Sequence, residues 1–104
     1  MTARRVKLTG GPEKTATWIW LEPETGGKLK VEYYDFSEPA HKFFGNDIAW
    51  TITVQEMNKL FSMINKDETS ILPWMEKCFR SYFGIKQWLE ENEIDFSIER
   101  ESWA

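Results

Sequence analysis

The sequence predicts an α+β fold: a single domain over residues 1–104, with helices packed on one face of a mainly antiparallel sheet of about five strands. Three observations predict it. Apolar and polar residues alternate through most of the first half, apolar residues recur at helical spacing in the second half, and 104 residues suit one hydrophobic core. The predicted order of elements is βββ-α-β-ααα-β.

Three strands are predicted at the start of the chain, over Arg4–Thr9, Thr15–Leu21 and Lys28–Phe36. The third alternates most clearly, since every second residue from Leu29 to Tyr33 is apolar and the positions between are charged. Glycine pairs at 10–11 and 26–27 supply the turns. We therefore expect an antiparallel meander.

A short helix and a fourth strand are predicted next. Ser37 and Pro39 are typical of a helix start and Gly45 of a helix end, so the helix is expected over 37–44. Alternation then predicts a strand over Asp47–Val54.

Helical spacing dominates after residue 56. Thr53–Glu56 matches a capping box, and apolar residues follow at i, i+3, i+4 and i+7 from Met57 to Ile64. A second helix is predicted to be capped by Ser70 and to carry one apolar stripe through Cys78 to Tyr82, where Gly84 ends it.

The end of the chain is predicted to hold one more helix and one more strand. Ile85, Trp88 and Leu89 share one helical face. After Asn92, Phe96 and Ile98 alternate with polar residues, which indicates a final strand.

Composition excludes several classes of protein. A net charge of −4 argues against nucleic-acid binding, and no apolar run is long enough to span a membrane or to act as a secretion leader. One cysteine allows no intrachain disulfide. We expect a cytoplasmic protein with Cys78 reduced.

Catalytic and metal-binding patterns are sparse. His41 and Cys78 are the only residues of their types, and Cys78 lies on an apolar helical stripe, which favours a buried structural thiol. Glu32, Asp35, Glu38 and His41 recur every three residues, as in a metal site or in a solvated rim. We expect the rim, no metal, no cofactor and no enzymatic activity.

The net negative charge is concentrated in residues 90–104. This segment carries a net charge of −5, and the remainder of the chain carries +1. Two interpretations remain open: a solvated end that keeps the protein soluble, or a docking surface for a basic partner. The candidate partner-binding residues are Glu90, Glu91, Glu93, Asp95, Glu99, Glu101 and, as an aromatic anchor, Trp103.

Six tryptophans are the second notable feature. Trp18 and Trp20 share one face of a strand whose other face, with Ile19 and Leu21, is also apolar. If helices cover a single face, one pair must point outward. An outward tryptophan pair is either a ligand or interface surface, or is covered by the long side chains of neighbouring arginines and lysines.

Two segments carry a resemblance. The stretch from Val31 to Val54, with Tyr33-Tyr34-Asp35-Phe36 and Phe43-Phe44-Gly45-Asn46-Asp47, and the ending Glu-Asn-Glu-Ile-Asp-Phe at 91–96 resemble a loose group of small acidic bacterial proteins of unassigned role. Proteins of this general type include immunity proteins, which neutralise toxic enzymes. The resemblance implies a binding role and contains no catalytic motif.

These observations lead to one functional expectation and two alternatives. We expect a protein-binding domain, in its sharpest form an immunity-type inhibitor that blocks a toxin through an acidic and aromatic surface. The first alternative is a small-molecule binding module with an aromatic pocket. The second is an enzyme using Glu32, Asp35 or His41.

Overall fold

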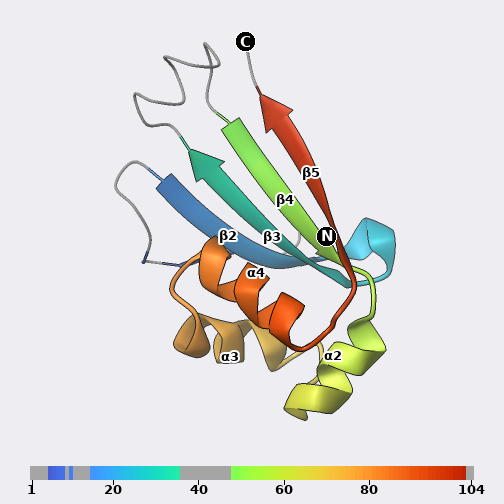
Figure 1. Cartoon of the computed structure of the whole chain (residues 1–104). Coiled ribbons are helices and arrows are strands. Elements are labelled where there is room, and N and C mark those ends of the chain that lie inside the picture. Colours follow the sequence, from blue (N-terminus) through green and yellow to red (C-terminus); the bar gives the residue numbers. More distant parts are fainter. Residues whose placement is uncertain (1–4, 9, 11–14, 36–47, 103–104) are drawn as a thin grey trace.

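Five strands form one antiparallel sheet in which every strand pairs with its neighbour in the sequence, in the order β1-β2-β3-β4-β5 (Figure 1). The computed structural model describes residues 5–8, 10, 15–35 and 48–102. The strands are β1 (Val6–Leu8), β2 (Thr15–Glu22), β3 (Lys28–Asp35), β4 (Ile48–Val54) and β5 (Phe96–Ser102). The predicted meander is confirmed and extends over the whole sheet.

Three α-helices lie between β4 and β5 in the sequence and pack on one face of the sheet (Figure 1). They are α2 (Met57–Ile64), α3 (Ile71–Cys78) and α4 (Tyr82–Glu91), and a short 3-10 helix, η1 (Pro23–Thr25), links β2 to β3. Helix α3 packs against β1, and α4 packs against β3. The predicted α+β arrangement is confirmed.

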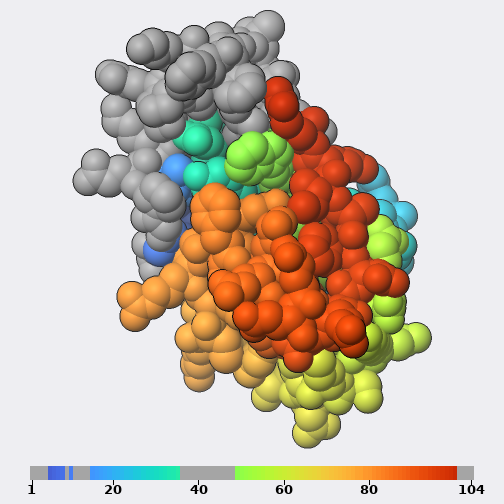
Figure 2. Space-filling model, in the orientation of Figure 1, coloured from blue at the N-terminus to red at the C-terminus, as the bar shows by residue number. Residues whose placement is uncertain are grey.

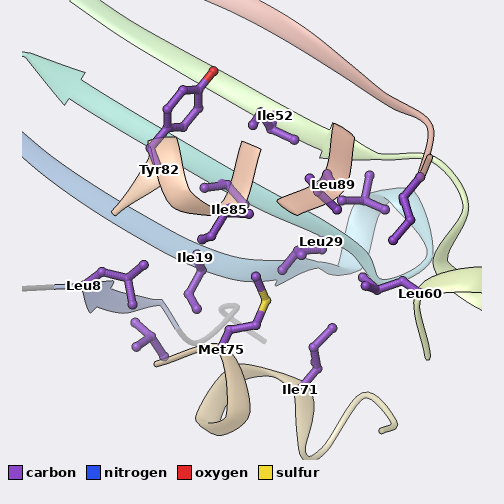
Figure 3. Packing of buried hydrophobic residues seen from close by; sticks show 14 of the residues in the cluster. Leu8, Ile19, Leu29, Ile52, Leu60, Ile71, Met75, Tyr82, Ile85 and Leu89 are labelled. Carbon is purple, nitrogen blue, oxygen red and sulfur yellow. The ribbon is translucent and has the colours of Figure 1, made fainter. Parts of the chain in front are cut away.

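The core fills the space between the helices and the sheet. Figure 3 shows Ile71 and Met75 of α3 and Ile85 of α4 pointing toward Ile19 and Leu29 of the sheet, and all five are fully buried. Burial of this many aliphatic side chains supplies the main driving force for folding. The helices therefore cover the face predicted from the alternation of β3. In β2, where the sequence left both faces open, the core side carries Ile19.

On the other face of the sheet, the strand register aligns side chains of neighbouring strands in rows. Across one row, Trp18 of β2 lies opposite Glu32 of β3, which lies opposite Thr51 of β4, which lies opposite Glu99 of β5. Successive residues of a strand point to opposite faces, so this row lies on the side away from the helices. We call it the helix-free face.

The predicted capping box of α2 is wrong. Thr53 is the penultimate residue of β4, where its hydroxyl accepts a hydrogen bond of 2.7 Å from Lys30 Nζ. Helix α2 instead begins after Glu56, which makes no side-chain capping bond. Pairing of Thr53 with β3 therefore outweighs the local capping pattern.

The boundary between α3 and α4 also differs from the prediction. Phe79 is extended and ends α3, α4 begins at Tyr82, and Gly84 lies inside α4 rather than at a break. The Tyr82 N–H donates a buried 3.0 Å bond to Thr17 Oγ1 of β2, so a distant strand caps α4. Because the apolar stripe stops at this break, Cys78 is exposed, and its predicted burial is wrong.

One predicted element lies outside the described residues, namely the helix over 37–44. The first strand spans three residues, fewer than the range Arg4–Thr9 predicts, and the last strand extends beyond Glu99 to Ser102. No helix in the described part of the chain is long and apolar enough to cross a membrane.

Candidate functional site

The acidic residues predicted to bind a partner gather along one side of the molecule, where α4 leads into β5. Glu90 and Glu91 occupy the last turn of α4. Glu93 and Asp95 lie in the connection, and Glu99 lies on β5. All five are exposed. Figure 2 shows this part of the chain as adjoining orange and red surfaces, and we call it the acidic side.

Backbone hydrogen bonds fix the connection between α4 and β5. The N–H of Ile94 donates to the carbonyl of Leu89 at 3.0 Å, and the Ile94 side chain is buried. Glu93 takes the left-handed conformation, with φ of 55°, and its carbonyl accepts a 2.7 Å bond from Lys59 Nζ of α2. Because Ile94 is anchored inward, the side chains of Glu93 and Asp95 on either side of it reach solvent.

The carboxylates differ in how well they are partnered. Glu90 pairs with Lys86 at 2.8 Å, and Glu91 accepts a 3.1 Å bond from the Gln87 amide, both one turn earlier on α4. The carboxylates of Glu93, Asp95 and Glu99 take part in none of the hydrogen bonds or ion pairs found among the described residues. These three charges are therefore available to an external cation.

The acidic side wraps around an edge rather than forming one plane. Glu99 lies on the helix-free face, opposite Thr51. Glu90 and Glu91 belong to the helix layer on the other side of the sheet. The candidate residues therefore lie on both sides of the sheet.

The structure describes the backbone of one further candidate residue and leaves the last one outside the described residues. Glu101 belongs to β5, where its backbone pairs with Ala49. Trp103 lies outside the described residues.

A shallow apolar hollow adjoins the acidic side on the helix face. It measures about 300 Å³ and is lined by Trp50 of β4, Ile98 of β5, and Tyr82, Phe83 and Lys86 of α4. Phe83 and Ile98 are each 45% exposed, and they are two of the three large apolar side chains that are exposed in the described part of the chain. The sequence raised an aromatic pocket as an alternative but did not identify these lining residues.

Aromatic contacts shape the hollow from below. The ring of Tyr33 stacks on Trp50 with centroids 5.6 Å apart and meets Phe83 edge-on at 4.9 Å. Burial raises the pKa of Tyr33 and of Tyr82, and the nearby charge of Glu90 raises the pKa of Tyr82 further. One signal was present in the sequence: neighbouring helical residues point about 100° apart, so Tyr82 and Phe83 cannot both face the core.

Trp18 and Trp20 point to the helix-free face, as the alternation requires once Ile19 enters the core. Trp20 is nevertheless only 5% exposed, because the Arg5 guanidinium lies 4.1 Å from its ring centre. Lys7 Nζ lies 5.7 Å from the Trp18 ring. Basic side chains of β1 and its flank therefore cover this pair, and only Trp18 keeps partial exposure.

The candidate catalytic residues do not converge. Glu32 lies on the helix-free face, and Asp35, three positions later on the same strand, lies on the opposite face. Glu38 and His41 lie outside the described residues. Over residues 5–8, 10, 15–35 and 48–102, no three histidine, cysteine or acidic side chains are grouped as metal ligands.

Comparisons with protein-family models, with curated proteins and with solved structures found no match.

Proposed function

We propose that this chain is a non-enzymatic protein-binding domain that binds a basic partner through the acidic side. One observation carries the proposal: Glu93, Asp95 and Glu99 are exposed, their carboxylates have no hydrogen-bond or ion-pair partner among the described residues, and Ile98, next to Glu99 on β5, lines an apolar hollow. Clustered charge of one sign attracts an oppositely charged partner over long range, and an adjacent apolar surface holds it after contact.

The sharper form of this proposal is an immunity-type inhibitor that acts in the bacterial cytoplasm. Its carboxylates would pair with basic groups by which a toxic enzyme holds a polyanionic substrate, and so occlude that site. The resemblance of the segments 31–54 and 91–96 to small acidic bacterial proteins supports this form.

Charge reversal tests the proposal. A triple variant carrying E93K, D95K and E99K should lose a stoichiometric partner that the unaltered chain captures from its source cells at low salt. Its melting temperature should change little, because these side chains are exposed and have no partners among the described residues.

A matched control has the same change in net charge elsewhere on the surface. Glu24, Glu68 and Glu76 are also exposed but lie on η1, on the α2–α3 turn and on α3. The variant E24K/E68K/E76K should keep the partner. Equal loss of the partner in both variants would show that net charge, and not the acidic side, governs binding.

The inhibitor form needs a separate measurement. The captured protein, once purified, should cleave or modify a polyanionic substrate, and the chain should suppress that activity at an equimolar ratio. A partner with no such activity would leave protein binding intact but contradict the inhibitor.

A small-molecule binding module is the alternative, and the hollow of about 300 Å³ favours it. Its volume is at the lower end of those that bind small ligands. Trp50 is the one described tryptophan that lines it, so a bound metabolite should change tryptophan fluorescence in the unaltered chain and not in W50F. No change with a metabolite pool would contradict this alternative.

A further inference from the structure

The outer edge of β5 is the longest unpaired strand edge in the described part of the chain. β5 has seven residues and pairs on one side with β4, and no described strand pairs with its other side. The opposite edge of the sheet, β1, has three. An open strand edge presents backbone donors and acceptors that can pair with another extended chain.

The phase of the β4–β5 ladder shows which backbone groups point outward. Gln55 N donates to Asp95 O at 2.9 Å, and the two residues are directly opposite in the register of this pair. Bonding in an antiparallel ladder alternates along each strand, so Ser97 and Glu99 bond to β4. The N–H and C=O groups of Phe96 and Ile98 therefore point to the open edge.

Side chains on the two faces of β5 differ in chemistry. On the helix face, Ile98 borders the apolar hollow with Phe83 and Trp50. On the helix-free face, Glu99 presents a carboxylate that has no partner in the described part of the chain. A strand added beside β5 would place alternate side chains next to these two surfaces.

We infer that β5 binds, by antiparallel strand addition, an extended segment of a partner protein in which basic residues alternate with apolar ones. Its basic side chains lie beside Glu99 on the helix-free face, and its apolar side chains lie beside Ile98 at the hollow. This inference rests on the proposed function, since it specifies how the acidic side would hold a basic partner.

A second copy of this chain fits the edge poorly. The described side chains of β5 on the helix-free face are Ser97 and Glu99. In a symmetric antiparallel pairing of two β5 strands, the helix-free faces of both copies lie on the same side of the joined sheet. Glu99 would then lie beside Ser97 or Glu99 of the second copy, and neither is basic. Charge complementarity therefore favours a basic partner segment over self-association.

Binding of synthetic peptides tests the mode directly. The probe is a labelled peptide of about nine residues, the length of an ordinary strand, in which lysine alternates with valine. Its control has the same composition with all lysines at one end. Fluorescence anisotropy should show binding of the alternating peptide about tenfold tighter, because only it separates apolar and basic side chains onto two faces. Equal affinities would overturn the inference.

Backbone methylation gives a sharper comparison. The outward N–H and C=O groups of Ile98 bond to the peptide residue directly opposite, whose side chain lies on the same face of the sheet as Ile98. That residue is a valine, so the valine N–H groups of the bound peptide point to β5 and the lysine N–H groups point away. Methylating the valine amides should abolish binding, and methylating the lysine amides should leave it nearly unchanged. If both methylated peptides lost binding equally, or if neither lost binding, strand addition would be contradicted.

A proline variant removes the other hydrogen bond of the same residue pair, from the Ile98 N–H to a valine carbonyl of the peptide. I98P removes an outward N–H and leaves the Ser97 and Glu99 bonds to β4 in place, a position where proline is tolerated. It should weaken the alternating peptide about tenfold or more, through a lost hydrogen bond and a smaller apolar contact. If I98P does not fold, the methylated peptides still decide the question on the unaltered chain.

The two proposals fail in distinguishable ways. Loss of a captured partner in E93K/D95K/E99K but not in I98P, with methylation having no effect, would keep the acidic side and overturn strand addition. Dependence of peptide binding on the valine amides, with no effect of the triple variant on partner capture, would keep strand addition and contradict the proposed function. A concentration-dependent dimer that I98P abolishes would identify a second copy as the occupant and overturn the inference.

Discussion

The two edge strands of the sheet, β1 and β5, share one backbone geometry and differ in whether their side chains are buried. At the β1 edge, Val6 and Leu8 are buried and the strand packs against α3. At the β5 edge, Ile98 is 45% exposed, and Glu99 has no partner among the residues that the structure describes. One edge is part of the core, and the other is an accessible surface.

Charge follows the same division. Arg5 and Lys7 lie over Trp20 and Trp18, so basic groups at the β1 edge are used within the molecule. The unpartnered charges near β5 are acidic. An edge that contributes to stability and an edge that is free to bind should therefore respond differently to substitution.

The largest difference is expected between two truncations of similar size. L8A removes a side chain that is 2% exposed and should lower the free energy of unfolding by about 3 kcal/mol. I98A removes a half-exposed side chain and should cost less than about 1 kcal/mol. Urea denaturation of both variants measures this, and equal losses would show that the β5 edge is also structural.

A glycine at the β1 side should give the next largest effect. Gly10 N donates to Arg80 O at 2.8 Å, and a Cβ at Gly10 would overlap the Cβ of Arg80. G10A should destabilise the fold by about 1–3 kcal/mol.

A second glycine supplies the control for that variant. Gly84 lies in the first turn of α4, with no atom closer than 3.9 Å to an added Cβ. G84A should stabilise by about 0.5–1 kcal/mol because alanine favours the helix. Thermal melts of the two variants should move in opposite directions, and a common direction would contradict the packing described for Gly10.

The basic cover of the tryptophans should contribute less. R5A removes a guanidinium 4.1 Å from the Trp20 ring centre and should cost about 0.5–1 kcal/mol. K7A, at 5.7 Å from Trp18, should cost less. Denaturation curves measure both variants, and the indole N–H resonance of Trp20 reports the contact with Arg5. An unshifted Trp20 resonance in R5A would exclude this stacking.

The smallest effect is expected for a carboxylate away from the β5 edge that has internal partners. Asp67 Oδ1 accepts bonds from the backbone N–H and hydroxyl groups of Thr69 and Ser70, which hold its pKa below the ordinary value of 3.8. The folded state therefore binds a proton less readily than the unfolded state. The resulting stability is present above about pH 3.8 and is lost as pH falls through the lower folded pKa.

The corresponding test compares D67N with the unaltered chain by thermal melts across the acid range. The variant should be slightly less stable at neutral pH and equally stable in strong acid. A stability difference that persists unchanged below the folded pKa would have another cause. D67N should also leave partner binding intact, unlike E99K.

Local patterns were enough to predict the sheet. Alternation in β3 assigned Val31 to the core, and alternation in β2 placed Ile19 and Trp18 on opposite faces without showing which of them meets the helices, because a strand has a period of two wherever it lies. The same alternation placed Phe96 and Ile98 on a strand. The composition of residues 90–104 likewise identifies the acidic segment.

Patterns failed where a distant group competes for the same atoms. Thr53 matched a capping box but is held in β4 by pairing with its neighbours, and Lys30 binds its hydroxyl. Tyr82 begins α4 because Thr17, 65 residues away, accepts its N–H. The resulting break leaves Cys78 exposed.

The accessible surface depends on both levels. Alternation, helical spacing and charge are properties of neighbouring residues, so the chain alone determines the fold class and the acidic segment. Helix boundaries, the hollow at Phe83 and Ile98, and the open edge of β5 depend on which distant groups meet. Tertiary packing decides those features, because hydrogen bonds and buried area depend on distance in space and not on separation along the chain.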